Sequence, residues 1–81
     1  MEISKFKELL TNGFDVEFNI EDVFYSFTKV PVNGEIRYYI GNENYTENHN
    51  FSSIDELLAY KINGIELSKI VETIDEEEVN Y

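Results

Sequence analysis

The chain has no cysteine and no tryptophan, and only one proline and one histidine among its 81 residues. Without cysteine it can form no disulfide, no thiolate nucleophile and no cysteine zinc site. Secreted domains of this size often depend on disulfides, and the segment Met1–Lys5 lacks the apolar core of a signal peptide. We therefore expect a cytoplasmic protein. No apolar run approaches the ~20 residues that span a bilayer, so we also expect no membrane insertion.

Basic residues are scarce as well. Six Lys and Arg stand against 17 Asp and Glu, which gives a formal net charge of −11. This balance opposes direct binding to nucleic acid, whose phosphates attract Lys and Arg, and it opposes binding to an anionic membrane surface. Two interpretations remain open. The charge can serve solubility alone, or an acidic surface can occupy the basic groove of a nucleic-acid-binding protein.

Residues suited to catalysis or cofactor binding form no recognisable pattern. His49 is the single histidine, and no second ligand stands at a metal-binding spacing from it. Ser52 and Ser53 are better explained as helix caps than as nucleophiles. The four glycines are scattered and form no phosphate-binding loop. We predict no catalytic, cofactor-binding or metal-binding residue, and a protein that is not an enzyme.

The length of the chain and its hydrophobic content of 42% predict one domain over residues 1–81. In the N-terminal half, apolar residues at helical spacing predict a short helix over Ser4–Thr11. Alternation of apolar and polar residues predicts a strand over Phe14–Ile20. Residues with high strand propensity predict two more strands, over Val23–Val30 and Glu35–Gly41. The turn signal Asn33–Gly34 joins these two strands as a hairpin.

The two predicted turns select the same buried face. A two-residue loop at Asn33–Gly34 pairs Phe27 with Ile40, and a two- or four-residue loop around Glu21–Asp22 pairs Phe18 with Tyr25. A slip of one residue in either hairpin would break this agreement. We therefore predict a three-stranded antiparallel meander with one common inward set, namely Val16, Phe18, Tyr25, Phe27, Ile36, Tyr38 and Ile40.

In the C-terminal half, the polar segment Asn42–Asn50 is expected to be a loop. Ser53 with Glu56 three residues later is a capping box, which predicts a helix that ends at Asn63–Gly64. A second helix is expected over Ile65–Ile74, because Leu67, Ile70, Val71 and Ile74 form one apolar stripe. The predicted fold is thus α+β: a short N-terminal helix, the meander, and two C-terminal helices packed on one sheet face.

The acidic run Asp75–Glu78 follows the negative end of the last predicted helix, where carboxylates are unfavourable. We expect residues 75–81 to form a frayed acidic tail that is solvated or binds a partner. Docking of Val79 and Tyr81 on the domain is the alternative.

The outward face of the meander is the most informative predicted surface. Phe24 and Tyr39 place large rings where a solvated face would carry small polar residues, and rings among charges are typical of protein interfaces. A loop, the tail or a second subunit covering these rings is the alternative, so a monomer and a homodimer both remain open. The candidate partner-binding residues are Asp15, Glu17, Phe24, Arg37 and Tyr39, with Asp75, Glu76, Glu77 and Glu78 of the tail.

Three segments carry a resemblance: the run from Phe51 to Leu58, the run from Lys61 to Leu67, and the pair Ile70–Val71. With the turn and strand Gly13–Phe18, they make the chain resemble small acidic uncharacterised proteins of phages and mobile elements of low-GC Gram-positive bacteria. Some proteins of this kind are anti-CRISPR inhibitors, which bind an effector complex and can imitate nucleic acid. The resemblance implies a protein-binding inhibitor and assigns no site residues.

Two functional hypotheses follow. The first is a non-enzymatic protein that binds a basic, nucleic-acid-binding host protein by imitating nucleic acid. The second is a structural or assembly module that self-associates through its outer sheet face.

Overall fold

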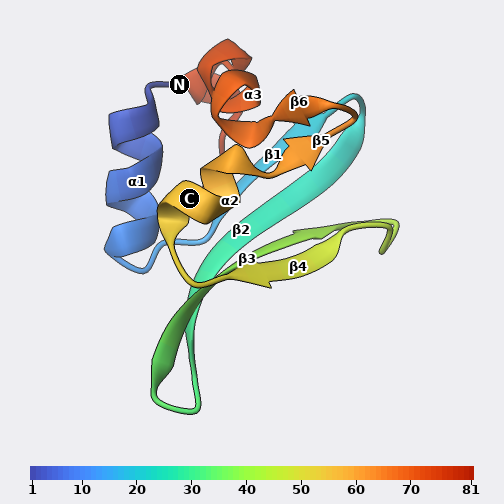
Figure 1. The fold of residues 1–81 in the computed structure, drawn as a ribbon. Coiled ribbons are helices and arrows are strands. Elements are labelled where there is room, and N and C mark those ends of the chain that lie inside the picture. Colours follow the sequence, from blue (N-terminus) through green and yellow to red (C-terminus); the bar gives the residue numbers. More distant parts are fainter.

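The computed structural model describes all 81 residues and has an α+β architecture (Figure 1). Four antiparallel strands form one sheet in the order β1-β2-β3-β4, and a separate hairpin pairs β5 with β6. Three helices gather on one side of the sheet, while the tip of the β2–β3 hairpin projects away from them. The elements are α1 (Ile3–Thr11), β1 (Val16–Ile20), β2 (Val23–Val32), β3 (Glu35–Asn42), β4 (Asn48–Phe51), α2 (Ile54–Ala59), β5 (Lys61–Ile62), β6 (Ile65–Glu66), α3 (Leu67–Thr73) and the 3-10 turn η1 (Glu76–Glu78).

The α+β class and the register of the first three strands are confirmed. Phe18 lies opposite Tyr25, and Phe27 lies opposite Ile40. Both connecting turns have two residues at positive φ, 52° and 84° for Asn33 and Gly34, and 49° and 65° for Glu21 and Asp22. Such paired left-handed residues match the right-handed twist of the strands that they join.

The inward face of the sheet and the three helices share one core. Sixteen buried residues form this core cluster, with Phe18 and Phe27 at its centre and their ring centroids 5.1 Å apart. Phe6 of α1 meets Phe27 edge to face at 5.6 Å. The helices contribute Leu9 and Leu10 of α1, Leu57 and Leu58 of α2, and Leu67, Ile70 and Val71 of α3. The opposite face of the sheet carries no helix and is the candidate binding surface.

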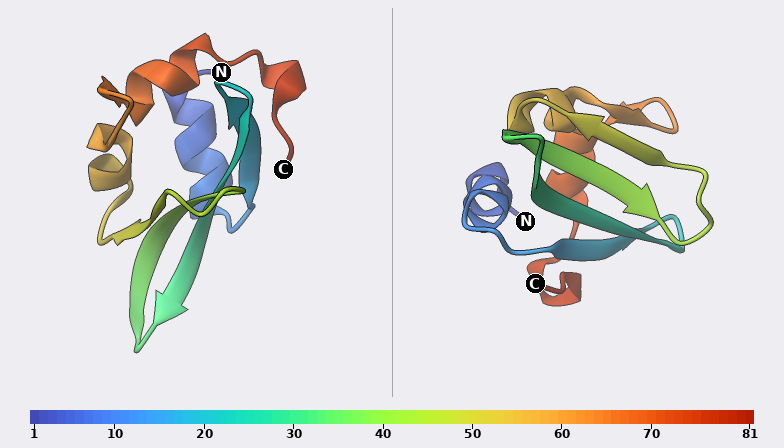
Figure 2. Two further views of the ribbon diagram at one scale, coloured as in Figure 1. Left: turned by 90° about the vertical axis from the view of Figure 1, so that its right-hand side faces the viewer. Right: turned by 90° about the horizontal axis from the view of Figure 1, so that it is seen from below.

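Ile36 was predicted to be buried, and that prediction is wrong: 46% of its surface is exposed. Ile36 and Val32 each lie within two residues of the turn Asn33–Gly34, and this end of the β2–β3 hairpin extends beyond the helices (Figure 2). The alternation of apolar residues gives the correct face of the strand. It does not show how far along the strand that face is covered.

The predicted loop over Asn42–Asn50 is also wrong in part, because its end forms the fourth strand, β4. Pairing with β3 places Asn48 opposite Gly41 and His49 opposite Ile40. A strand at a sheet edge can carry polar side chains on both faces, so its sequence shows little of the apolar alternation that marks a central strand. The meander therefore has four strands instead of three.

Helix α2 begins where the capping signal predicts, but it ends at Ala59 and not at Asn63–Gly64, because Lys61 and Ile62 pair as strand β5. The Oγ atom of Ser53 accepts a hydrogen bond from the backbone N–H of Glu56 at 3.1 Å. The carboxylate of Glu56 accepts a hydrogen bond from the Oγ of Ser52 at 2.6 Å. In a standard capping box this carboxylate would accept from the backbone N–H of Ser53.

The predicted helix over Ile65–Ile74 begins two residues too early. Ile62 and Ile65 pair across a two-residue turn in which Asn63 and Gly64 have φ of 53° and 80°. This is the same hairpin turn as Asn33–Gly34, and the backbone pairing that it sets up keeps Ile65 and Glu66 extended. The last helix, α3, therefore starts at Leu67.

The C-terminal tail is ordered, which corrects the prediction of a frayed end. Val79 is 8% exposed and belongs to the core cluster, and Asn80 pairs with Glu17 of β1. In the right-hand view of Figure 2 this segment lies beside β1. Tyr81 is 57% exposed, with its ring against Phe14 at a centroid distance of 6.4 Å. Burial of Val79 and the backbone pairing of Asn80 with Glu17 hold this segment against the domain.

Candidate functional site

The outer face of the sheet is hollowed along its middle. Two adjoining hollows, with volumes of about 330 and 370 Å³, share Ser26 of β2, Gly41 of β3 and Asn48 of β4. These three residues lie side by side across the strands, because Gly41 is the pairing partner of both Ser26 and Asn48. We call this row the trough. Its floor is low because two of its three residues are small.

Rings stand on both sides of the trough. Phe24 lies two residues before Ser26 on β2, and Tyr39 lies two residues before Gly41 on β3. Each residue adds about 3.3 Å along a strand, so about 13 Å separates the rows that carry the two rings. Both residues are half-buried, and each lines one of the two hollows. The sheet register therefore places Phe24 and Tyr39 on the same face of the sheet, at opposite ends of the trough.

The space above Gly41 is open. Its φ is not positive, and a Cβ atom placed on Gly41 would meet no other atom within 4 Å. Neither backbone conformation nor close packing thus requires glycine at this position. Gly41 leaves room for a group from outside the chain.

Glu43 is fixed at the mouth of the trough. Its Oε1 atom accepts a hydrogen bond from the backbone N–H of Phe24 at 3.0 Å, and its own N–H donates to the Phe24 carbonyl at 2.9 Å. No hydrogen bond within the chain engages Oε2, and the side chain is exposed. The carboxylate is therefore held by one oxygen, while the second oxygen is available to a cation.

Tyr45 projects from the turn between β3 and β4 at the same mouth. It is 89% exposed, the highest value among the large hydrophobic residues, and its φ is +60°. This left-handed conformation is uncommon for a bulky residue. Asn42 sustains the turn, because its Oδ1 accepts from the Glu47 N–H at 3.0 Å and its Nδ2 donates to the Thr46 Oγ1 at 2.9 Å.

Glu47 joins this turn to helix α2. Its Oε1 accepts from the Tyr60 hydroxyl at 2.8 Å and lies 3.2 Å from the Nε2 of His49. The His49 and Tyr60 rings lie 5.0 Å apart. Burial raises the pKa of Tyr60 to about 12, aided by its hydrogen bond to Glu47 and by the charge of that carboxylate. The cluster anchors the β4 edge to the end of α2.

The other predicted residues of the sheet are more dispersed. Asp15 precedes β1 and is exposed, and Glu17 faces outward at the β1 end of the trough, opposite Ser26. Arg37 lies towards the hairpin tip, where its Nε donates to the Oδ1 of Asn50 at 2.8 Å. Arg37 thus does not line either hollow.

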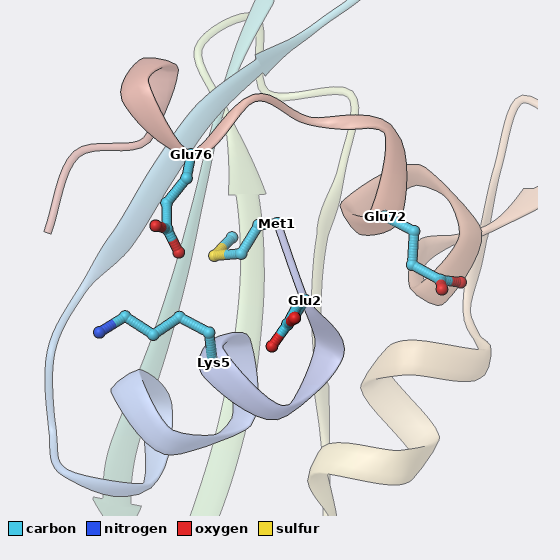
Figure 3. A pocket seen from close by; sticks show the side chains of 5 residues that line it. All are labelled: Met1, Glu2, Lys5, Glu72 and Glu76. Carbon is cyan, nitrogen blue, oxygen red and sulfur yellow. The ribbon is translucent and has the colours of Figure 1, made fainter.

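The predicted tail residues lie at the β1 edge and not beside the trough. Asp75 caps the 3-10 turn by accepting from the Glu77 N–H at 3.1 Å, and Glu77 and Glu78 are exposed. Glu76 lines an open recess with Met1, Glu2, Lys5 and Glu72 (Figure 3). In that view the Glu72 side chain points away from the others, so the carboxylates around the recess do not meet at one point.

Sequence reasoning missed the trough itself. Gly41, Glu43, Tyr45 and Asn48 lie in or beside Asn42–Asn50, the segment that the sequence predicts to be a loop. Tyr45 could have indicated this site from the sequence, since it is a lone aromatic residue among asparagines and glutamates. An aromatic ring in a polar segment is commonly either buried or in contact with a partner.

No group of three or more metal-ligating side chains comes together in the structure, and no helix is both long and apolar enough to cross a membrane. The comparisons with known proteins found no match: no family model, no curated protein and no solved structure is similar to the chain.

Proposed function

We propose that this protein is a non-enzymatic binder of a basic protein, and that its acidic surface does the binding. The observation that carries the proposal is the lack of internal neutralisation. Of the 17 acidic side chains, only Asp55 and Glu47 lie within ion-pair distance of a basic group, 3.0 Å from Lys7 and 3.2 Å from His49 respectively. The other carboxylates have no basic side chain within that distance, and most of them are exposed.

The basic residues add little compensation. Lys29 donates to the carbonyl oxygen of Thr11 at 2.6 Å, and Arg37 donates to Asn50. Charge of one sign distributed over a small surface steers association with a partner of the opposite sign. A nucleic-acid-binding protein presents such a surface, because it must neutralise phosphates.

Together with the resemblance to small acidic phage and mobile-element proteins, this charge favours an inhibitor that acts in the cytoplasm. It would occupy the nucleic-acid groove of a host effector, in the manner of an anti-CRISPR protein that imitates nucleic acid. The trough and its rings supply a specific contact within the broader acidic surface, since aromatic residues dominate the energy of many protein interfaces.

A competition experiment tests the proposal. The protein is immobilised and exposed to lysate of a low-GC Gram-positive bacterium at about 0.1 M and about 1 M salt. We expect capture of a basic nucleic-acid-binding protein at the lower salt, and its release by added duplex DNA. Nucleic-acid imitation is contradicted if duplex DNA does not release the captured protein. It is also contradicted if the capture is unchanged at the higher salt.

The alternative is a self-assembling module that pairs through the outer sheet face. The half-buried rings of Phe24 and Tyr39 favour it, while the like charge of two copies opposes it. Sedimentation over a range of concentrations separates the two functions. A dimer that forms at raised salt, where this repulsion is screened, and that is lost on substitution of Tyr39 supports self-assembly.

A further inference from the structure

The trough combines three features that one kind of side chain can use together. It has the aromatic residues Phe24 and Tyr45 in its lining, carboxylates at its mouth, and an unfilled floor above Gly41. The charged residues that line the two hollows are Glu43 and Glu47, and both are acidic. Glu17 adds a third carboxylate at the β1 end. A neutral or anionic occupant would leave this charge unmatched, so the trough favours a cation.

We propose that the trough binds an arginine side chain presented by the basic partner, with the guanidinium group between Phe24 and Tyr45 and against the free Oε2 of Glu43. This inference rests on the proposed function and specifies the contact by which it would act. Arginine fits because its planar guanidinium stacks on rings and donates through a rigid fork to carboxylates. Lysine offers a compact, strongly hydrated charge that does neither as well.

The site is prepared before the partner arrives. The hydrogen bond from the Phe24 N–H fixes Glu43, and the hydrogen bonds of Asn42 fix the turn that presents Tyr45. Groups that are already in place lose little conformational freedom on binding. Tyr45 adopts a left-handed backbone conformation, in which asparagine or glycine would be less strained. Its ring is exposed and adds nothing to the core, so we attribute the tyrosine to contact with a partner and not to folding.

Gly41 supplies the sharpest test. The substitution Gly41→Val fills the trough from below; its Cβ atom would meet no other atom within 4 Å, and a β-branched residue suits a strand. We expect this variant to fold at least as stably as the parent and to lose arginine binding by tenfold or more. Glu43→Gln keeps an oxygen that can accept from the Phe24 N–H and removes only the charge. Glu35→Gln removes the same charge from the distant hairpin tip and serves as its matched control.

The probes are a short peptide of alternating arginine and glycine and its counterpart with lysine in place of arginine. Binding to the isotope-labelled protein is followed by NMR at low salt. We expect the arginine peptide to bind about fivefold more tightly than the lysine peptide, with shifts concentrated at Ser26, Gly41 and Tyr45. Glu43→Gln should weaken binding about fivefold, and Glu35→Gln by less than about twofold.

The outcomes separate this inference from the function on which it rests. Equal binding of both peptides, unaffected by Gly41→Val, overturns the arginine site and leaves a general acidic binder standing. No binding of either peptide at low salt counts against both. Shifts at the trough that appear on concentrating the protein without peptide overturn the arginine site as well, because the occupant is then a second copy of the chain.

Discussion

Glu17 and Asn80 exchange two backbone hydrogen bonds, of 2.9 and 2.8 Å, so the end of the chain closes the outer edge of β1. Val79 brings Asn80 into place, since it is 8% exposed and packs in the core. The β1 edge of the sheet is thereby paired at Glu17 by the chain itself. The other edge, β4, carries polar side chains, which is a second way in which proteins protect a strand edge.

This docking predicts that Val79→Ala destabilises the fold. Two buried methyl groups are lost and a small cavity remains, so the free energy of unfolding should fall by about 1–3 kcal/mol. Urea denaturation measures it. Glu77→Ala, an exposed position in the same segment, should change the value by less than about 0.5 kcal/mol. Equal effects of the two substitutions would show that the tail is not packed in solution.

Ile36 and Ile40 allow a paired test on one strand. They lie on the same face of β3, but Ile36 is 46% exposed and Ile40 is 1% exposed. Ile40→Ala should cost about 2–5 kcal/mol of stability, and Ile36→Ala less than about 1 kcal/mol. Chemical denaturation of the two variants side by side checks the difference. A large loss from Ile36→Ala would mean that the hairpin tip is covered in solution.

Asn42→Ala should remove the support of the turn that carries Tyr45. The substitution leaves the Glu47 N–H without its side-chain acceptor, and we expect a loss of about 1–3 kcal/mol in stability. Asn19→Ala, an exposed position on β1, is the control. Hydrogen exchange of the Glu47 amide should rise in Asn42→Ala and stay unchanged in Asn19→Ala. Protection of that amide in both variants would refute this role of Asn42.

The raised pKa of Tyr60 links stability to alkaline pH. With a pKa of about 12 against an ordinary value of 10.0, the folded protein holds this proton more tightly than the unfolded chain does. Stability is therefore unaffected by Tyr60 below about pH 10 and falls as pH rises towards 12. Absorbance titration of the parent should show one tyrosine that ionises later than the others, and this late step should be missing in Tyr60→Phe. A late step of the same size in both proteins would show that the tyrosine with the raised pKa is not Tyr60.

The sequence by itself determined the local patterns of the first half of the chain. Alternating apolar residues and the two turns at Glu21–Asp22 and Asn33–Gly34 give the register and inward face of β1, β2 and β3, because side chains in a strand alternate strictly between faces. Ser53 likewise marks the start of α2, since a cap depends on residues three positions apart.

Tertiary structure decided the rest. The strand β4 has polar side chains and forms only because β3 offers it an edge. Asn63–Gly64 carries the same turn signal as Asn33–Gly34, yet its flanking residues pair for only two positions before α3 begins. The trough, finally, joins Ser26, Gly41 and Asn48 from three strands. No property of one segment indicates such a site, because register between strands creates it.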